Sequence, residues 1–291
     1  MLTEALLILL NSLFYALVIF AVSSGFNLIF GVMKIVNLAH GHFYSLAAFI
    51  SAFLLLNTKI EPIYLAFLLP FLAALITSLV GLAFEVGLLR PIYRKPYYLQ
   101  ILLTLGVIYI FNDLFCIIFG RAPLQPTEIC KAPGSIIIFN QLYPLYNLIV
   151  IGVSFTIGVI LWLLLYKTKF GIALRAVSLD TEISLALGID IKKIYTLTFV
   201  ISVALAGIAG GFIVPVIAAS LGIAEEMLIL SLIVTIIGGM GSLKGALISS
   251  LIVSIFRSFA IFAFPEFELL VIYLVATIVL LIRPVGLFGG G

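Results

Sequence analysis

The chain has 291 residues, of which 64% are hydrophobic and 9% are charged, and its formal net charge is +3. Since a soluble domain carries about 25% charged residues, this composition excludes a soluble fold, and so small a net charge gives no indication of nucleic-acid binding. Long apolar runs without alternating polarity, such as residues 145–165, exclude a membrane β-barrel. Only helices then satisfy the backbone within lipid. The sequence therefore predicts an all-α integral membrane protein, a polytopic helix bundle.

Apolar segments of about 20 residues are long enough to cross a bilayer, and the sequence predicts eight or nine of them. The second carries Asn37, His40 and His42 at its start, so we expect its first turn to be broken. The seventh is short and flanked by glycines, and a re-entrant segment is the alternative for it. The expected spans are residues 6–30, 35–57, 63–88, 99–119, 146–166, 195–217, 227–239, 246–264 and 268–283.

The distribution of positive charge predicts the orientation, because Lys and Arg gather in short cytoplasmic loops. Five connections, which we assign to the cytoplasm, hold 11 of the 15 basic residues. Nine spans then place the N-terminus outside and the C-terminus inside, in a single membrane domain covering residues 1–291. The 11 residues are Lys34, Arg90, Arg94, Lys95, Lys167, Lys169, Arg175, Lys192, Lys193, Lys244 and Arg283. The opposite side keeps Lys59, Arg121 and Lys131, with most of the acidic residues.

The longest cytoplasmic loop, about residues 167–193, contains signals for a short helix with a stop at each end. Asp180 is a good N-cap. Glu182 lies in the first turn, where negative charge suits the helix dipole. Gly188 is placed as the left-handed residue that ends a helix. Together they predict a two-turn helix over residues 181–187.

This predicted helix is apolar on one face. Ile183 and Leu187 are four residues apart and share that face, which Leu179 and Ala186 extend. The face either packs back on the protein's own helix ends or docks into a groove on a cytoplasmic subunit. Spacing alone leaves both interpretations open.

The loop resembles the coupling loop of ABC-importer permeases, whose pattern is E-A-A-x-x-x-G. Glu182 and Gly188 match this pattern, whereas Ile183 and Ser184 replace the two alanines, as is typical of the branched-chain amino acid (Liv-type) branch. In that branch a GxxLRA-like stretch precedes the helix, here residues 171–176. The resemblance makes the following the candidate ATPase-coupling residues: Arg175, Asp180, Glu182, Ile183, Leu187 and Gly188.

Further segments resemble the same family in the same order along the chain. Residues 25–41 contain its N-x-A-H-G core, and residues 198–211 resemble the helix after the coupling loop. Residues 236–246 match its GGxGSxxGA turn, and residues 283–289 match its R-P-x-G-L-F-G ending. The external connection, residues 120–143, is the part that matches poorly.

The resemblance implies a permease subunit of an ABC importer in the inner or plasma membrane of a prokaryote. Its partners would be separate cytoplasmic ATPase subunits, a second related permease and an external substrate-binding protein. Its substrates would be leucine, isoleucine, valine and related amino acids, with urea or short amides as the alternative. The chain has no GxxxxGK[ST] phosphate loop of its own. A stand-alone ion-coupled carrier and an intramembrane enzyme are the other classes considered, and we expect neither catalytic residues nor a cofactor.

Polar residues within the spans are few, and each has a structural alternative to a functional role. Asn37, His40 and Gly41 share one helical face. They either line a polar passage or, as we favour, bond a broken helix end. His40 and His42 project to opposite sides of a helix, so we expect no metal site.

Charged groups within the spans suggest two pairings. Glu85 and Arg90 are expected to pair at the membrane interface. Asp113 and Arg257 either pair with each other or, as we favour, both extend to the outer interface. Cys116 and Cys130 are two inert thiols or, less favoured, a disulfide near the external loop.

Glycines mark two further places. Gly207, Gly210 and Gly211 form a small-residue face that permits close helix approach. The glycine-rich stretch at residues 238–245 is either a gate element, as in broken transporter helices, or a plain tight turn. The candidate residues of a translocation path are Asn27, Asn37, His40, Gly41, Gly238, Gly239 and Gly241.

Overall fold

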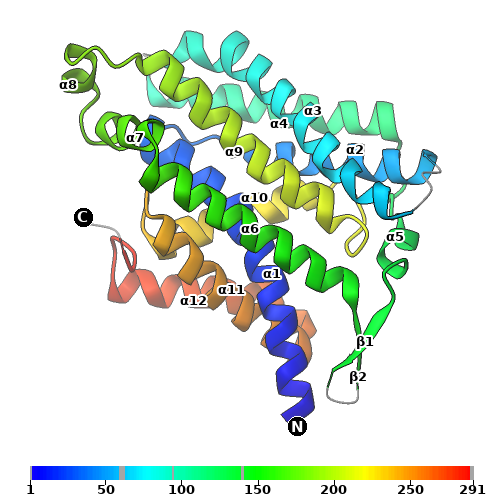
Figure 1. Cartoon of the computed structure of the whole chain (residues 1–291). Coiled ribbons are helices and arrows are strands. Elements are labelled where there is room, and N and C mark those ends of the chain that lie inside the picture. Colours follow the sequence, from blue (N-terminus) through cyan, green and yellow to red (C-terminus); the bar gives the residue numbers. More distant parts are fainter. Residues whose placement is uncertain (1, 59–62, 94, 139–140, 289–291) are drawn as a thin grey trace.

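The computed structural model is a helix bundle in which seven helical segments are long and apolar enough to cross a membrane (Figure 1). The structure describes residues 2–58, 63–93, 95–138 and 141–288. Lys59 and Arg94, which entered the assignment of orientation, lie outside these ranges, as does Gly289 of the tail motif. Two shorter helices, α2 and α10, pack among the seven.

The first part of the chain forms four long helical segments. Their bounds are α1 (Leu2–Leu28) with a π-helical turn (Ile29–Met33), α2 (His40–Asn57), α3 (Leu69–Phe84) and α4 (Tyr97–Phe119). α3 is extended at both ends by short turns: a 3-10 helix (Ile63–Leu68), a π-helix (Glu85–Leu89) and a second 3-10 helix (Arg90–Ile92). The predicted break at the start of the second span is confirmed, because residues 34–37 are irregular and α2 begins only at His40.

The connection after α4 corrects the prediction of a purely helical protein. It contains a short helix, α5 (Thr127–Lys131), and an antiparallel hairpin of β1 (Ser135–Ile138) and β2 (Gln141–Pro144). The apolar residues of β1 are β-branched isoleucines, which favour a pleated strand. Cys116 and Cys130 are free thiols, so the disulfide alternative is wrong.

The second part of the chain forms the remaining helices. They are α6 (Leu145–Lys167), α7 (Lys169–Leu179), α8 (Thr181–Ala186), α9 (Ile191–Ile213), α10 (Ile223–Gly238), α11 (Leu243–Ala263), a 3-10 turn (Pro265–Phe267) and α12 (Glu268–Ile282). Figure 1 shows α7, α8 and the C-terminus at one end of the bundle, and the N-terminus and the hairpin at the other.

Helix α9 lies at the centre and α12 at the edge. About 67% of the apolar stretch of α9 is buried within the chain, against 17% of Pro265–Ile282. The small-residue face predicted for Gly207, Gly210 and Gly211, which lies on α9, is confirmed. A Cβ on Gly210 would lie 2.1 Å from the Tyr44 carbonyl oxygen, and one on Gly211 would lie 2.9 Å from that of Pro70. α9 therefore packs directly on the backbones of α2 and α3.

Candidate functional site

Two short helices, α7 and α8, connect α6 to α9 and meet at Asp180. The Asp180 N–H donates to the Ala176 carbonyl oxygen at 3.1 Å and so ends α7. Its side chain begins α8, because Oδ1 accepts a hydrogen bond from the Ile183 N–H at 2.9 Å. The predicted N-cap is therefore confirmed. Helix α7 was not expected from the sequence.

Helix α8 ends at the glycine predicted to stop it. Gly188 has a φ of +82°, a conformation that glycine adopts without steric cost. Its N–H donates to the Leu185 carbonyl oxygen at 3.0 Å, and the Ile189 N–H donates to that of Ser184 at 3.0 Å. These two bonds form a Schellman motif, which satisfies the free carbonyls of a helix end. α8 is thus closed at both ends by its own residues.

The apolar face of α8 is uncovered. Leu179, Ile183, Leu185 and Leu187 are 60–81% exposed, whereas Ser184 is buried against the chain. The interpretation in which this face packs back on the protein's own helix ends is therefore wrong. Leu185 was not expected to contribute, because it lies off the single Ile183–Leu187 stripe. It is exposed because α8 contacts the chain through one side only.

Helix α7 is attached to α6. The Arg175 guanidinium donates to the Leu165 carbonyl oxygen and lies 5.3 Å from the centre of the Tyr166 ring. A Cβ on Gly171 would lie 2.0 Å from the same Leu165 oxygen, so only glycine allows this approach. Arg175 therefore positions α7 on α6, whereas Glu182 is exposed in the first turn of α8.

Asn27 of α1 clamps the glycine-rich turn between α10 and α11. Its Nδ2 donates to the Ser242 carbonyl oxygen at 3.0 Å, and its Oδ1 accepts from the Gly241 N–H at 2.6 Å. Gly241 has a φ of +84°. A Cβ on Gly31 would lie 2.7 Å from the Gly241 Cα, so the two backbones touch. Two separate sequence motifs thus meet in one contact.

The C-terminal tail closes the other side of the same turn. The Leu287 N–H donates to the Ile237 carbonyl oxygen at 2.8 Å, and the Phe288 N–H donates to that of Gly238 at 3.1 Å. These bonds satisfy carbonyls that the end of α10 leaves free. Gly239, with a φ of +90°, turns the chain toward α11. The contacts favour a tight turn over an open gate for this stretch.

At the start of α2, Asn37, His40 and Gly41 are buried. Asn37 Oδ1 accepts from the Ala39 N–H at 3.1 Å, and the Asn37 carbonyl oxygen accepts from the His40 N–H at 3.1 Å. The His40 Nε2 lies 3.1 Å from the Val22 carbonyl oxygen of α1. A Cβ on Gly41 would lie 2.1 Å from the Ala224 carbonyl oxygen of α10. These contacts favour the helix-bonding interpretation of Asn37, His40 and Gly41.

The predicted pairing of Glu85 with Arg90 is confirmed. Arg90 donates to the fully buried Glu85 carboxylate through Nε at 3.2 Å and through a terminal nitrogen at 2.9 Å. A π-helical turn over Glu85–Leu89 brings residues five apart onto one side. The same Arg90 nitrogen also donates to the Thr196 hydroxyl at 2.6 Å and so ties this end to α9.

The suggested Asp113–Arg257 pair is wrong, because Arg257 pairs with two carboxylates in the first turns of α10 and α12. Its guanidinium donates to Glu226 of α10 at 2.5 Å and to Glu268 of α12 at 2.5 Å. It also lies 5.3 Å from the centre of the Tyr15 ring. Asp113 is exposed on α4. Four helices therefore meet around one buried cation.

A second polar cluster was missed by the sequence reasoning. The His42 Nε2 lies 3.2 Å from Asn112 Oδ1 and 3.6 Å from a Glu225 oxygen, and Asn112 Nδ2 donates to that oxygen at 3.2 Å. His40 and His42 do project to opposite sides, as expected. No local signal joins three residues from α2, α4 and α10, because each is isolated in its own apolar run.

A bundle with seven described helical segments long and apolar enough to cross a membrane is the architecture of a polytopic membrane protein. The comparisons with known proteins agree. A family model described as branched-chain amino acid transport system / permease component matches residues 8–280. The chain therefore belongs to the branched-chain amino acid transport permease family.

Individual relatives are similar along nearly their whole length. The permease protein BraD of Pseudomonas aeruginosa is 27% identical, over 92% of this chain and 90% of the relative. The probable permease protein LivH of Methanocaldococcus jannaschii is 29% identical, over 87% and 80%. In fold, the chain resembles PsaBC from Streptococcus pneumoniae in complex with Fab, at 16% identity and a TM-score of 0.50, over 97% of this chain and 95% of that one.

Proposed function

We propose that this chain is the membrane-spanning permease subunit of an ABC importer, and that it moves branched-chain amino acids driven by separate ATPase subunits. Membership of the permease family supports the class, and the names of BraD and LivH, which specify branched-chain amino acid transport, support the substrate. The observation that carries the coupling to ATPases is α8, whose own caps hold it in shape while its apolar side chains remain uncovered.

Nine helical crossings form this permease domain: the seven long segments together with α2 and α10. An odd number agrees with the opposite ends at which Figure 1 places the two termini. The end that carries α8 is cytoplasmic, in the inner membrane of a prokaryote. The four lysines that flank α7 and α8 support this orientation, namely Lys167, Lys169, Lys192 and Lys193.

The exposed face around Ile183 docks into a groove on a cytoplasmic ATPase. Because α7 is held on α6 by Arg175 and Gly171, and because α8 leads directly into α9, movement of the docked ATPase pulls on both long helices. The coupling residues then have separate roles, and Ile183 and Leu187 form the docking face. Asp180 and Gly188 stabilise the two ends of α8, and Arg175 holds the preceding helix, α7, on α6.

A second permease and an external substrate-binding protein complete the importer. The candidate path residues hold the ends and crossings of α1, α2, α10 and α11 together. We propose that these residues hold in place the helices that border the path, and that movement of the ATPases rearranges those helices. The residues concerned are Asn27, Asn37, His40, Gly41, Gly238, Gly239 and Gly241.

The test is to purify the full chain from its native membrane with its bound subunits, reconstitute the assembly in liposomes, and measure uptake of labelled leucine. We expect uptake that requires hydrolysable ATP and the external binding protein. Urea in place of leucine serves as the comparison substrate. Uptake by the chain alone, driven by an ion gradient, would contradict the proposal.

A further inference from the structure

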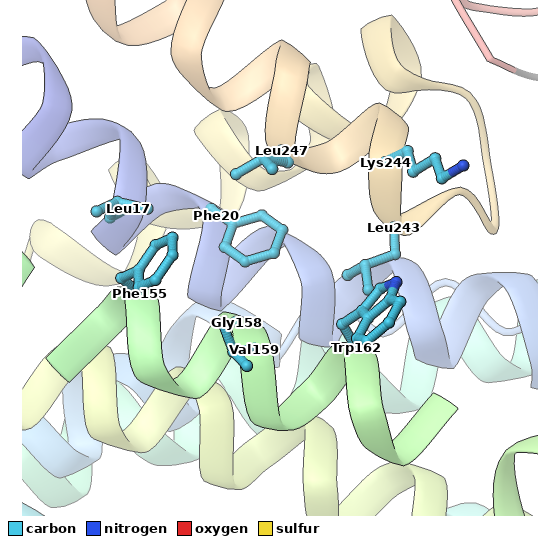
Figure 2. A pocket seen from close by; sticks show the side chains of 9 residues that line it. All are labelled: Leu17, Phe20, Phe155, Gly158, Val159, Trp162, Leu243, Lys244 and Leu247. Carbon is cyan, nitrogen blue, oxygen red and sulfur yellow. The ribbon is translucent and has the colours of Figure 1, made fainter. Parts of the chain in front are cut away.

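An apolar groove runs along the outside of the bundle between α1, α6 and α11, well apart from α8. Its cavity volume is about 210 Å³. Figure 2 shows Leu17 and Phe155 toward one end and Trp162, Leu243 and Lys244 toward the other. The full lining is Leu17, Phe20, Phe155, Gly158, Val159, Trp162, Leu243, Lys244 and Leu247.

The groove has walls of hydrocarbon and aromatic rings. Phe20 and Leu17 of α1 form its buried floor, whereas Phe155 and Leu247 are exposed on its two sides. Gly158 leaves the groove open above Phe20, because a Cβ at this position would lie only 3.0 Å from the Phe20 ring and would fill part of the space. An apolar cavity of about 150 Å³ is large enough to bind benzene, so this groove has room for a segment of hydrocarbon chain.

Lys244 is the one charged residue of the lining. It lies in the first turn of α11, where the helix dipole disfavours positive charge. Among the described residues no carboxylate lies within salt-bridge distance of it. Trp162 points its indole nitrogen toward the same end of the groove (Figure 2). The groove itself is lined almost entirely by carbon atoms, and the Lys244 ammonium extends beyond this end of it, where the headgroup of a lipid seated in the groove would lie.

We propose that this groove binds one anionic phospholipid of the cytoplasmic leaflet, with an acyl chain along Phe20 and Phe155 and the phosphate at Lys244. Phe155 and Trp162 are seven residues apart on α6, roughly 10 Å along the helix, which is within the half-thickness of a hydrocarbon core about 30 Å thick. Basic pockets at the cytoplasmic ends of membrane helices suit anionic headgroups. The leaflet, though not the groove, rests on the orientation proposed above.

The lining does not suit the other available occupants equally well. An amino acid carries both an ammonium and a carboxylate, and the groove offers Lys244 but no acceptor for the ammonium. A helix of a second permease would cover the apolar walls but leave Lys244 in the membrane interface without an anion. An anionic lipid places its acyl chain against the apolar walls and its phosphate near the Lys244 ammonium.

The single tryptophan of the chain is a built-in probe, because Trp162 lines the groove. The full chain is reconstituted in two kinds of phosphatidylcholine vesicle. One contains phosphatidylglycerol with brominated acyl chains, and the other contains the same mole fraction of phosphatidylcholine with brominated acyl chains. Quenching of Trp162 fluorescence is measured in both. We expect the anionic lipid to quench about fivefold more effectively at equal mole fraction. Lys244→Gln should abolish this preference.

Two further variants separate a groove site from general attraction of anionic lipid. Lys192→Gln removes an exposed lysine outside the groove and should leave the preference unchanged. Leu247→Phe narrows the groove from the α11 side and should lower the preference even though Lys244 is intact. Equal quenching by the two lipids would overturn the proposal, as would protection of Trp162 from both lipids, which is the result if a protein subunit covers the groove. None of these readouts depends on transport or on an ATPase.

Discussion

Two short segments at one end of the bundle, α8 and the turn between α10 and α11, both depend on glycines, yet they are stabilised in opposite ways. α8 satisfies its own ends, through Asp180 at one and the Gly188 motif at the other. The turn at residues 239–242 depends on distant parts of the chain, because Asn27 and the tail supply its hydrogen bonds. One segment is complete by itself, and the other is completed by the fold.

The difference shows which apolar surface is available to a partner. A helix that needs no tertiary contact to close its ends keeps its shape while its side chains remain uncovered. The turn offers no comparable surface to a partner, since its backbone polar groups are already hydrogen-bonded to Asn27 and to the tail. Substitutions in α8 should therefore change coupling without changing stability, and substitutions around the turn should do the reverse.

The largest effect is expected from Ile183→Asp. A carboxylate forced into a docked apolar interface costs about 3 kcal/mol or more, which is roughly a hundredfold in affinity for the ATPase. ATP-driven leucine uptake should fall to background. Because Ile183 is 60% exposed in the chain, the thermal unfolding temperature in detergent should not change. Ile183→Leu is the matched control and should retain uptake; normal uptake by the aspartate variant would remove α8 from the coupling mechanism.

Asn27→Ala should show the opposite pattern. It removes two hydrogen bonds and leaves the Gly241 N–H unpaired, at a cost of about 2–4 kcal/mol in stability. The unfolding temperature should fall clearly, while uptake per folded molecule is retained. Ser23→Ala is the control on the same helix, because the buried Ser23 hydroxyl has no hydrogen-bond partner among the described residues. If uptake per folded molecule fell as well, Asn27 would act in the translocation path and not only in the clamp.

Gly188→Val should have an intermediate effect. A residue with a Cβ held at positive φ costs about 1–2 kcal/mol, and a β-branched side chain resists this conformation most strongly. The last turn of α8 should fray, and the amount of ATPase that co-purifies should drop several-fold. Gly188→Asn tolerates positive φ and should retain most of the bound ATPase. An equal loss in both variants would point to a cause other than backbone conformation.

Asp180→Ala should have the smallest effect of the four. Loss of an N-cap costs about 1 kcal/mol of helix stability. Leucine uptake should fall a few-fold, with no change in the unfolding temperature of the bundle. Asp180→Ser restores a capping oxygen and should restore uptake. Failure of serine to do so would mean that the Asp180 charge, and not its cap, matters for docking.

Features set by neighbouring residues were predictable from the sequence. The spans follow from apolar length, and α8 follows from Asp180 and Gly188, whose effects act within a single turn. Glu85 and Arg90 are likewise close enough along the chain for their pairing to be expected.

Contacts between distant segments were not predictable. The bond from Asn27 to Ser242 joins residues 215 positions apart, so the same asparagine fits a path and a clamp equally well on sequence alone. The two partners of Arg257 lie on separate helices, and Glu226 and Glu268 had been placed with the external charges. The hairpin was missed because its apolar run is too short to separate strand from helix by periodicity.

The position of Arg257 has a consequence for how the transporter moves. Its two charge-assisted bonds join α10, α11 and α12 at one level, and the tail bonds the C-terminus to the end of α10 at another. These two sets of contacts lie at different positions along the helix axes, so together they restrain α10, α11 and α12 from rotating relative to one another. We therefore expect these three helices to move as one block during each transport cycle, together with α1, which packs along α11 and is tied to the same turn by Asn27.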